Sequence, residues 1–332
     1  MRGDEDETRV GALSEAEVLR RILGRLAPST APVGPGDDAA VLAAPGGRVV
    51  ATVDTLVHGP DFRLAWSSGH DLGWKAAAVN LADIAAMGAR PTALLVALAM
   101  PDDTPIDFVE ALADGLRAAC DRLAPGCAVE GGDLTVSDTL TIAVTALGVL
   151  EGEPVRRDGA RPGDVVTLAG DAGLAARGLG LLFDRFRDAA GTPVPLGPDH
   201  LAGLSHAERR ALAAQLRPNP PIGLGPVAAA AGATAMMDVS DGLVLDASRM
   251  AEASDVTVDL DTAALGDDPL VYAGGEDHAL LATFPAAAAA PDGFRIIGVI
   301  RSAGSARVLV DGRPFAGRGG WDPYRDWDAT TG

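Results

Sequence analysis

Several carboxylates in this sequence lie where an acid is costly unless it has a partner. Asp37 and Asp38 are adjacent after a glycine, and like charges this close repel unless a cation lies between them. Asp54 lies within the apolar segment 49–57, which predicts a strand, and Asp is rare in strands. Asp83 lies late in a predicted helix, where the helix dipole disfavours an anion. A solvated turn, an edge strand and an exposed helix position remain the alternatives for these residues taken singly.

Three further acidic positions follow or precede predicted strands. Asp133 ends a Gly-Gly-Asp triplet after one strand, and Glu276 follows two glycines before another. Asp238, Ser240 and Asp241 lie at a strand-to-helix junction. Mg²⁺ prefers carboxylates together with waters and substrate phosphates, and phosphoryl transfer depends on positioning and charge neutralisation by such ions. Asp241 as a helix cap and the glycine pairs as ordinary turns are the alternatives, but the whole set favours an enzyme that neutralises phosphates with several Mg²⁺ ions, helped by a few arginines.

The composition excludes other classes of protein. The 332 residues carry 27 basic and 46 acidic side chains, a net charge of −19, so we expect no nucleic-acid partner. The longest apolar run, Ala93–Met100, is too short to span a bilayer, and the acidic start does not resemble a secretory signal; no membrane association and a cytoplasmic location are expected. The two cysteines make neither a disulfide framework nor a zinc site. The single lysine, Lys75, lies in neither a P-loop nor a protein-kinase motif.

Strand and helix patterns are mixed along the chain, which predicts an α/β (α+β) fold in two domains. We expect a disordered N-terminus at 1–12, an N-terminal domain at 13–152 and a C-terminal domain at 153–332, with a hinge at 151–154. Strands are expected at 49–57, 93–99, 128–130, 140–150, 165–169, 236–239, 278–284 and 294–299, and a short apolar stretch lies at 39–42. Helices are expected at 14–26, 68–87, 107–123, from 174, at 207–216 and at 243–253, with a loop at 187–205. This order places most of the acids at the ends of strands.

Eight stretches of the sequence together resemble thiamine-monophosphate kinases, of the superfamily that includes aminoimidazole-ribonucleotide synthetase. They occur in the family's order and cover nearly the whole chain, and the AVNLADIAAMGA and DVSDGL stretches are the specific ones. The matching segments are GDDAAVL (36–42), DTLVHGPDF (54–62), KAAAVNLADIAAMGARP (75–91), EGGDLT (130–135), RRDGARPGD (156–164), MDVSDGL (237–243), GGEDHAL (274–280) and GWDPY (320–324).

The resemblance implies ATP-dependent phosphorylation of thiamine monophosphate to thiamine diphosphate with several Mg²⁺ ions, on an N-terminal α/β half that pairs in a homodimer and a C-terminal α/β half. It places metal ligands at Asp38, Thr52, Val53, Asp54, Asp83, Asp133, Asp238 and Asp241. It places ATP contacts at Gly132, Asp133, Arg157 and Ser240, and contacts to the phosphoryl acceptor at Asp61, Glu276 and Trp321. We expect direct in-line transfer, with no catalytic group beyond the metal clamp and Arg157, because a carboxylate that coordinates Mg²⁺ is a poor nucleophile.

Three positions depart from the family pattern. Val53 stands where Ser or Thr is frequent, so only its backbone carbonyl could bind a metal; Asp61 stands where a histidine can occur, and Pro221 where a second arginine is common. Trp321 has two interpretations, as a ring that stacks on the cationic thiazolium and as an anchor for the C-terminus. The alternative functions are a non-catalytic regulator that binds nucleotide or metal, and another ATP-using enzyme on the same scaffold.

Overall fold

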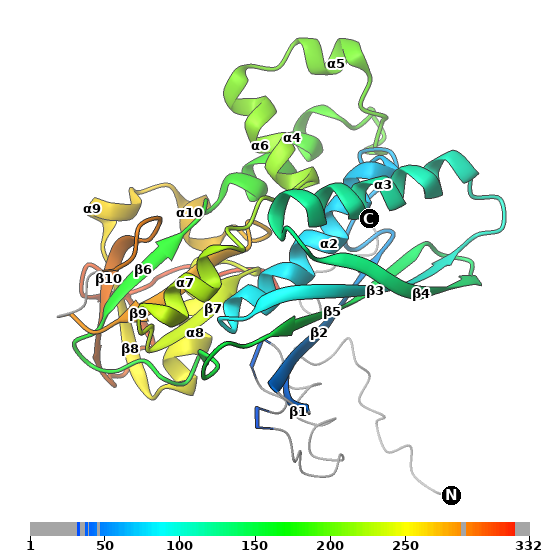
Figure 1. Ribbon diagram of the computed structural model, residues 1–332. Helices are drawn as coiled ribbons and strands as arrows, with labels where there is room; N and C mark the ends of the chain where they lie inside the picture. The colour runs from blue at the N-terminus through cyan, green and yellow to red at the C-terminus, as the bar shows by residue number, and fades with distance from the viewer. Residues whose placement is uncertain (1–31, 34–36, 39, 45–46, 287–289, 323–332) are drawn as a thin grey trace, which may run out of the picture.

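The computed structural model describes residues 32–33, 37–38, 40–44, 47–286 and 290–322, drawn in colour in Figure 1. The expected disordered N-terminus at 1–12 and the expected helix at 14–26 lie outside the described residues. The fold is a mixed α/β one, as predicted, with two sheets that are built from successive parts of the chain.

The first sheet has the strand order β1-β2-β5-β3-β4, and within the described part of the chain helices cover one of its faces. Alternate residues of β5 show which face is covered: Ile142, Val144 and Ala146 are fully buried, and the residues between them are half-buried. This period of two is what a strand with one packed face requires. The elements are β1 Ala40–Ala44, β2 Gly47–Val57, α2 Gly69–Ala86, β3 Arg90–Met100, α3 Ile106–Leu123, β4 Ala128–Val136 and β5 Thr141–Val149.

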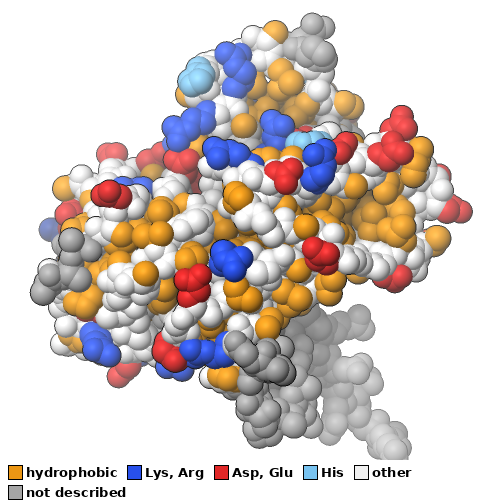
Figure 2. Space-filling model, viewed as in Figure 1, with side chains coloured by type: hydrophobic (Ala, Val, Ile, Leu, Met, Phe, Trp, Pro, Cys, Tyr) orange, Lys and Arg blue, Asp and Glu red, His pale blue; other side chains and the backbone are white. Residues whose placement is uncertain are grey.

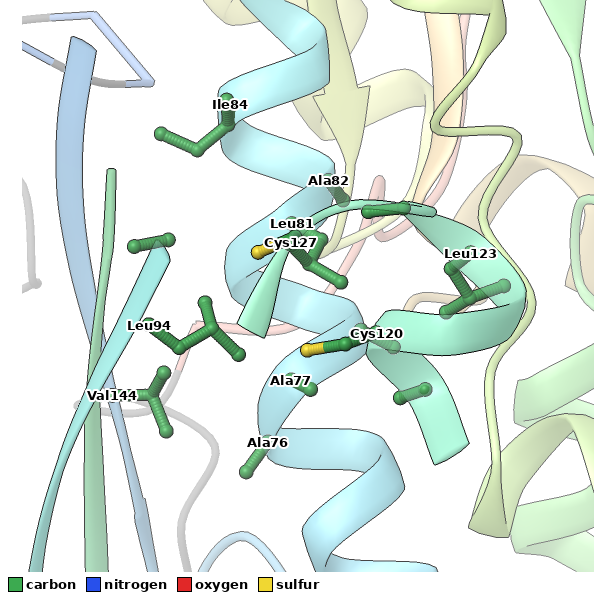
Figure 3. Packing of buried hydrophobic residues seen from close by; sticks show 14 of the residues in the cluster. Ala76, Ala77, Leu81, Ala82, Ile84, Leu94, Cys120, Leu123, Cys127 and Val144 are labelled. Atoms are coloured by element: carbon green, nitrogen blue, oxygen red, sulfur yellow. The ribbon is translucent and has the colours of Figure 1, made fainter. Parts of the chain in front are cut away.

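Helix α2 is the central element of the molecule. It begins with a capping box between Ser68 and Asp71, and the chain turns away at Gly88, whose φ is +75°. Small residues let other elements approach it closely: a Cβ atom on Gly73 would collide with the carbonyl oxygen of Leu112 in α3. Figure 3 shows the alanines and leucines of α2 packed between the sheet and the α3 end that carries Cys120 and Leu123.

Because α2 is buried nearly all round, it lacks the polar face of a surface helix. Its inner side packs on the first sheet, and its C-terminal end reaches the second half of the chain, where Ala86 joins one apolar cluster with Met236 and Leu280. The backbone N–H of Val155 also donates to the Met87 carbonyl oxygen at 3.1 Å. The few polar side chains of this helix therefore lie at contacts between elements.

The second sheet has the strand order β12-β11-β8-β10-β6-β9-β7, with α8 and α7 beside its β7 end in Figure 1. Helices α4, α5 and α6 form a separate layer above α2 and α3 in that view. No helix among the described residues is long and apolar enough to cross a membrane. The elements are β6 Val165–Ala169, α4 Leu174–Arg185, α5 Pro198–Ala202, α6 His206–Leu216, α7 Leu224–Ala230, β7 Ala235–Val239, α8 Leu243–Ala253, β8 Val256–Leu260, α9 Thr262–Leu265, α10 Pro269–Ala273, β9 Ala279–Phe284, β10 Arg295–Ser302, β11 Val308–Val310 and β12 Arg313–Pro314.

The structure corrects the expected strand at 128–130, which was to end before the Gly-Gly-Asp triplet. Strand β4 instead runs through the triplet to Val136, paired in parallel with β3 and with a shift of register at Glu130. Glycine suits position 132 because a Cβ there would collide with the Val96 carbonyl oxygen across the pair. The expected loop at 187–205 also contains the short helix α5.

Candidate active site

Strand β2 and helix α2 bring the first group of acidic positions together. Thr52 and Asp54 are two residues apart on β2 and therefore point to the same face of the sheet. The Thr52 hydroxyl donates to Asp83 Oδ2 at 2.8 Å, and the Asp54 backbone N–H donates to Asn80 Oδ1 at 2.9 Å. Asn80 in turn donates to the Ala76 carbonyl oxygen at 2.9 Å. The helix therefore fixes the position of the strand that carries Asp54.

Arg157 connects this group to the start of the first sheet. Its Nε lies 3.2 Å from Asp37 Oδ1, and its Nη2 donates to Asp38 Oδ1. The second oxygen of Asp38, Oδ2, is buried without a hydrogen-bond partner. Burial raises the pKa of Asp38 well above its ordinary value, and Arg157 offsets this only in part. A buried carboxylate oxygen with no donor is a position that a cation would stabilise.

The second half of the chain supplies the acids of the junction between β7 and α8. Asp238 is buried at the end of β7, and its Oδ2 lies 3.0 Å from His278 Nδ1. Asp241 Oδ2 accepts from Arg249 at 2.6 Å, and Arg249 also binds the fully buried Asp246 at 2.7 Å. Asp246 accepts the backbone N–H of Asp241 at 3.1 Å. The buried carboxylate of Asp246 thus fixes the turn that carries Asp241.

The two groups face each other across the contact between the halves of the chain. The pKa of Asp54 is raised by burial and by the charge of Asp238. The pKa of Asp83 is raised well above its ordinary value by burial and by the charges of Asp54 and Asp238. Burial also raises the pKa of Asp241, and the charge of Arg249 opposes this shift. Carboxylates in this arrangement repel one another, so the site favours cations.

This arrangement fits Mg²⁺ that keeps part of its shell in water and phosphate oxygens. Among the described residues, no group of three or more His, Cys, Asp or Glu side chains is close enough to hold a metal ion by itself. Mg²⁺ usually keeps several waters and is bound through one or two carboxylates together with substrate phosphates. Acids that influence one another's pKa without forming a closed cluster, with one buried carboxylate oxygen on Asp38 that has no hydrogen-bond partner, suit that mode of binding.

Gly132 and Asp133 are not brought to this group within the chain. Cross-strand pairs place Gly132 in one row with Val96, Val144 and Asp54, three strand spacings away from Asp54 or about 14 Å. Asp133 is the next residue, so its side chain points to the opposite face of the sheet. All nine residues of β4 are exposed. The structure therefore separates Asp133 from the other acids predicted to bind metal.

A cavity of about 470 Å³ adjoins the acids of the second half. It brings together Asp61, Glu276 and Trp321, the three positions predicted to bind the phosphoryl acceptor, which lie far apart in the sequence. Ser240 and Asp241 also line this cavity. The predicted acceptor positions therefore share one space with the edge of the acidic site.

The remaining lining gives the cavity an apolar, aromatic end. Trp66 and Phe183 line it, and the Arg63 guanidinium lies 5.2 Å from the centre of the Trp66 ring and 4.9 Å from that of Phe183. The backbone N–H of Trp321 donates to the Asp241 carbonyl oxygen at 2.9 Å, which fixes the C-terminal segment against the β7–α8 turn. The cavity combines aromatic rings, on which a ring of a ligand would pack, with carboxylates, beside which a phosphate would need a cation.

The sequence reasoning missed several residues of this cavity, among them Arg63, Trp66 and Gln215. The one signal that could have found a further residue is Lys75, the single lysine of the chain, which is buried and ion-paired with Glu276. Pairings between α2, α6 and a loop 200 residues away cannot be derived from local patterns.

Comparisons with known proteins show the family to which this chain belongs. The family model for the N-terminal domain of AIR synthase related proteins matches residues 36–150. Thiamine-monophosphate kinase from Mycobacterium tuberculosis is 41% identical to this chain, covering 95% of it and 93% of the relative, and that from Corynebacterium glutamicum is 40% identical, covering 96% of both. The solved structure of AaThiL complexed with AMPPCP and TMP superposes with a TM-score of 0.78 at 29% identity, covering 95% of this chain and 98% of the other.

Proposed function

Since the chain belongs to the thiamine-monophosphate kinase family, we propose that it transfers the γ-phosphoryl group of ATP to thiamine monophosphate, directly and in line. The observation that carries this proposal is the cavity that unites Asp61, Glu276 and Trp321 and opens beside Asp241. An acceptor bound there would have its ring among the aromatic residues and its phosphate at the acidic edge.

The acids of the site are proposed to hold Mg²⁺ with the nucleotide. Asp38, Asp54, Asp83, Asp238 and Asp241 would be its carboxylate ligands, with Thr52 beside Asp83. Bound there, Mg²⁺ would neutralise the charge of the two phosphate groups. We propose that Ser240, which lines the cavity, contacts the nucleotide phosphates where they meet the acceptor.

The chain's own residues then serve to orient the two substrates. The acceptor phosphate is largely ionised near neutral pH and needs no base, so holding the two phosphates end to end suffices. Arg157 reaches the acids of the first half, where it binds Asp37 and Asp38. We propose that its guanidinium also faces the nucleotide. No side chain is required as a covalent intermediate.

We further propose that the protein acts as a homodimer. Strand β4 is an edge strand, and its Val129, Leu134 and Val136 are 42%, 68% and 74% exposed. Figure 2 shows hydrophobic side chains gathered on the side of the molecule where α3, β3 and β4 lie. An exposed apolar edge is a template for another strand. A second copy would cover it, and Asp133, which faces away from the acids of its own chain, would then serve a site built across the dimer.

The proposal is tested by product analysis. The protein is incubated with ATP, Mg²⁺ and thiamine monophosphate, and thiamine diphosphate and ADP are quantified against reactions that omit one component. Equal amounts of ADP and thiamine diphosphate, dependent on every component, are expected. ADP without thiamine diphosphate would point to another ATP-using reaction, and neither product would favour a regulator that only binds.

A further inference from the structure

Lys75 occupies an unusual position for a lysine. It lies in the second turn of the buried helix α2 and is 4% exposed, although lysine is almost never fully buried unless it is paired. It also lines the cavity that contains Glu276. Packing alone does not explain why a cation is buried on the wall of this cavity.

The Lys75 ammonium joins three distant parts of the chain. Its Nζ donates to Glu276 Oε2, in the loop between α10 and β9. It also lies 3.3 Å from the side-chain oxygen of Gln215 in α6, in the amide orientation that lets the Gln215 nitrogen donate to the Ala175 carbonyl oxygen at 3.0 Å. Lys75 therefore ties α2, α6 and the Glu276 loop together at one point on the cavity wall.

Glu276 is held in a conformation that its own sequence does not favour. Its φ is +71°, in the left-handed region that non-glycine residues seldom adopt. Its backbone N–H donates to the Ser240 carbonyl oxygen at 2.7 Å, which fixes the main chain but not the carboxylate. The side chain is 44% exposed, toward the cavity, so one carboxylate oxygen binds Lys75 and the group as a whole remains accessible to a ligand.

We propose that Lys75 is a positioning residue that holds the Glu276 carboxylate in the orientation in which it binds the phosphoryl acceptor. This rests on the proposed function, in which Glu276 contacts the acceptor. The ion pair adds little to the free energy of unfolding, because the cost of desolvating the lysine offsets most of the electrostatic attraction. What the pair does provide is a fixed rotamer for a flexible side chain at the ligand surface.

The charges that line the cavity allow a positioning role for Lys75 to be distinguished from a purely electrostatic one. Burial by itself would raise the pKa of Glu276, but the Lys75 ammonium, the charge of His278 and the hydrogen bonds from Lys75 and Gln215 together hold that pKa below its ordinary value. Asp61 and Asp241 also line the cavity, so removing Lys75 makes the lining more negative. If Lys75 only set this charge, its removal would change acceptor binding equally whether or not Glu276 is ionised. A positioning role predicts weaker binding that depends on the Glu276 carboxylate.

The test compares Lys75→Met, Glu276→Gln and the double variant. The affinity for thiamine monophosphate is measured by calorimetry with a non-hydrolysable ATP analogue present, and the affinity for the analogue is measured separately. We expect each single variant to weaken acceptor binding about 10-fold or more, as for a lost charge-assisted hydrogen bond, with nucleotide affinity within about 2-fold. The double variant should be no weaker than Glu276→Gln, because Lys75 acts through Glu276.

Arg301→Met is the matched control, because it leaves the buried Asp259 of the second sheet without its ion pair, away from the cavity. It should lower the melting temperature and leave acceptor affinity unchanged. Unchanged or tighter acceptor binding by Lys75→Met would overturn the proposal. If Lys75→Met does not fold, the double variant is compared with Glu276→Gln, because the double variant buries no unpaired charge. A further 10-fold loss of acceptor affinity in the double variant would show that Lys75 acts directly on the acceptor, and it would overturn the positioning role.

Failure of the proposed function is visible separately. Because acceptor affinity is measured without turnover, a wild-type protein that binds thiamine monophosphate through Lys75 but forms no thiamine diphosphate would refute the reaction and support the positioning role. Wild-type protein that does not bind thiamine monophosphate would overturn both.

Discussion

Replacing Asp54 with asparagine separates the charge of the acidic site from its structure. The substitution is isosteric, and the backbone N–H of Asp54 that donates to Asn80 Oδ1 at 2.9 Å is retained. Desolvation and the charge of Asp238 raise the pKa of Asp54, so its ionised carboxylate does not stabilise the fold when no cation is present. Asp54→Asn should therefore fold and, without Mg²⁺, melt at a temperature no lower than that of the wild-type protein.

The same change should lower turnover by about 10²-fold. Removal of one preorganised group that stabilises transition-state charge typically costs 10²–10³ in kcat, and about 10² corresponds to about 2.7 kcal/mol. We expect the lower end of this range because Asp38, Asp83 and Asp238 remain to hold cations around the same space. Asp241→Asn should behave similarly, since Arg249 keeps its second partner, Asp246.

The assay measures kcat for thiamine diphosphate formation at saturating substrates, together with melting temperature across a Mg²⁺ titration. Asp114→Asn, an exposed position on α3 paired with Arg117, is the control and should change neither. Asp54→Asn should also reduce the rise in melting temperature that Mg²⁺ produces. A folded Asp54→Asn protein with near-native turnover and an unchanged Mg²⁺ response would refute the assignment of Asp54 as a metal ligand.

Three further outcomes are expected. Trp321→Ala should weaken thiamine monophosphate binding more than nucleotide binding, because the ring lines the cavity while its backbone bond to Asp241 is retained; equal losses in calorimetry would indicate a packing role for the C-terminal segment. Gly73→Ala should lower the free energy of unfolding, measured by chemical denaturation, by about 1–3 kcal/mol or more, since the added Cβ would collide with the Leu112 carbonyl oxygen. Gly180→Ala in α4 is the control and should be neutral or stabilising, because a Cβ there contacts no other atom. Without Mg²⁺, the melting temperature of Asp83→Asn should exceed that of the wild-type protein by a margin that grows as pH rises. The raised pKa of Asp83 gives the wild-type protein stability at acid pH, and this stability is lost as pH rises through the raised value. A margin that does not change with pH would contradict this.

Much of the fold follows from local patterns in the sequence. A serine cap at Ser67 or Ser68 and the glycine at 88 predicted the ends of α2 closely, because both signals depend on hydrogen bonds within a few residues. The strand through Asp133 was predicted to stop too early, because glycine marks turns unless a partner strand requires it. The strand β8 was not predicted at all, and its buried Asp259 has partners from two segments far along the sequence, Arg301 of β10 and the backbone N–H of Gly312.

The site was predictable as a set of residue types but not as an arrangement. The cost of an acid in an apolar setting is a local property, so Asp38, Asp54, Asp83 and Asp238 could be singled out in the sequence. Which of them face each other depends on the contact between the two halves of the chain, which no local pattern encodes. The aromatic end of the cavity combines Trp66 with Phe183 from α4, and their proximity also depends on packing between distant segments.

Single-turnover transfer from γ-labelled ATP tests the central claim most directly. The protein is mixed with labelled ATP and Mg²⁺, with and without thiamine monophosphate, and quenched in acid. Direct in-line transfer predicts that the label passes from ATP to thiamine diphosphate at the rate of turnover, with none bound to protein when the acceptor is omitted. Stoichiometric protein-bound label that hydroxylamine releases, and that thiamine monophosphate removes at the turnover rate, would contradict it.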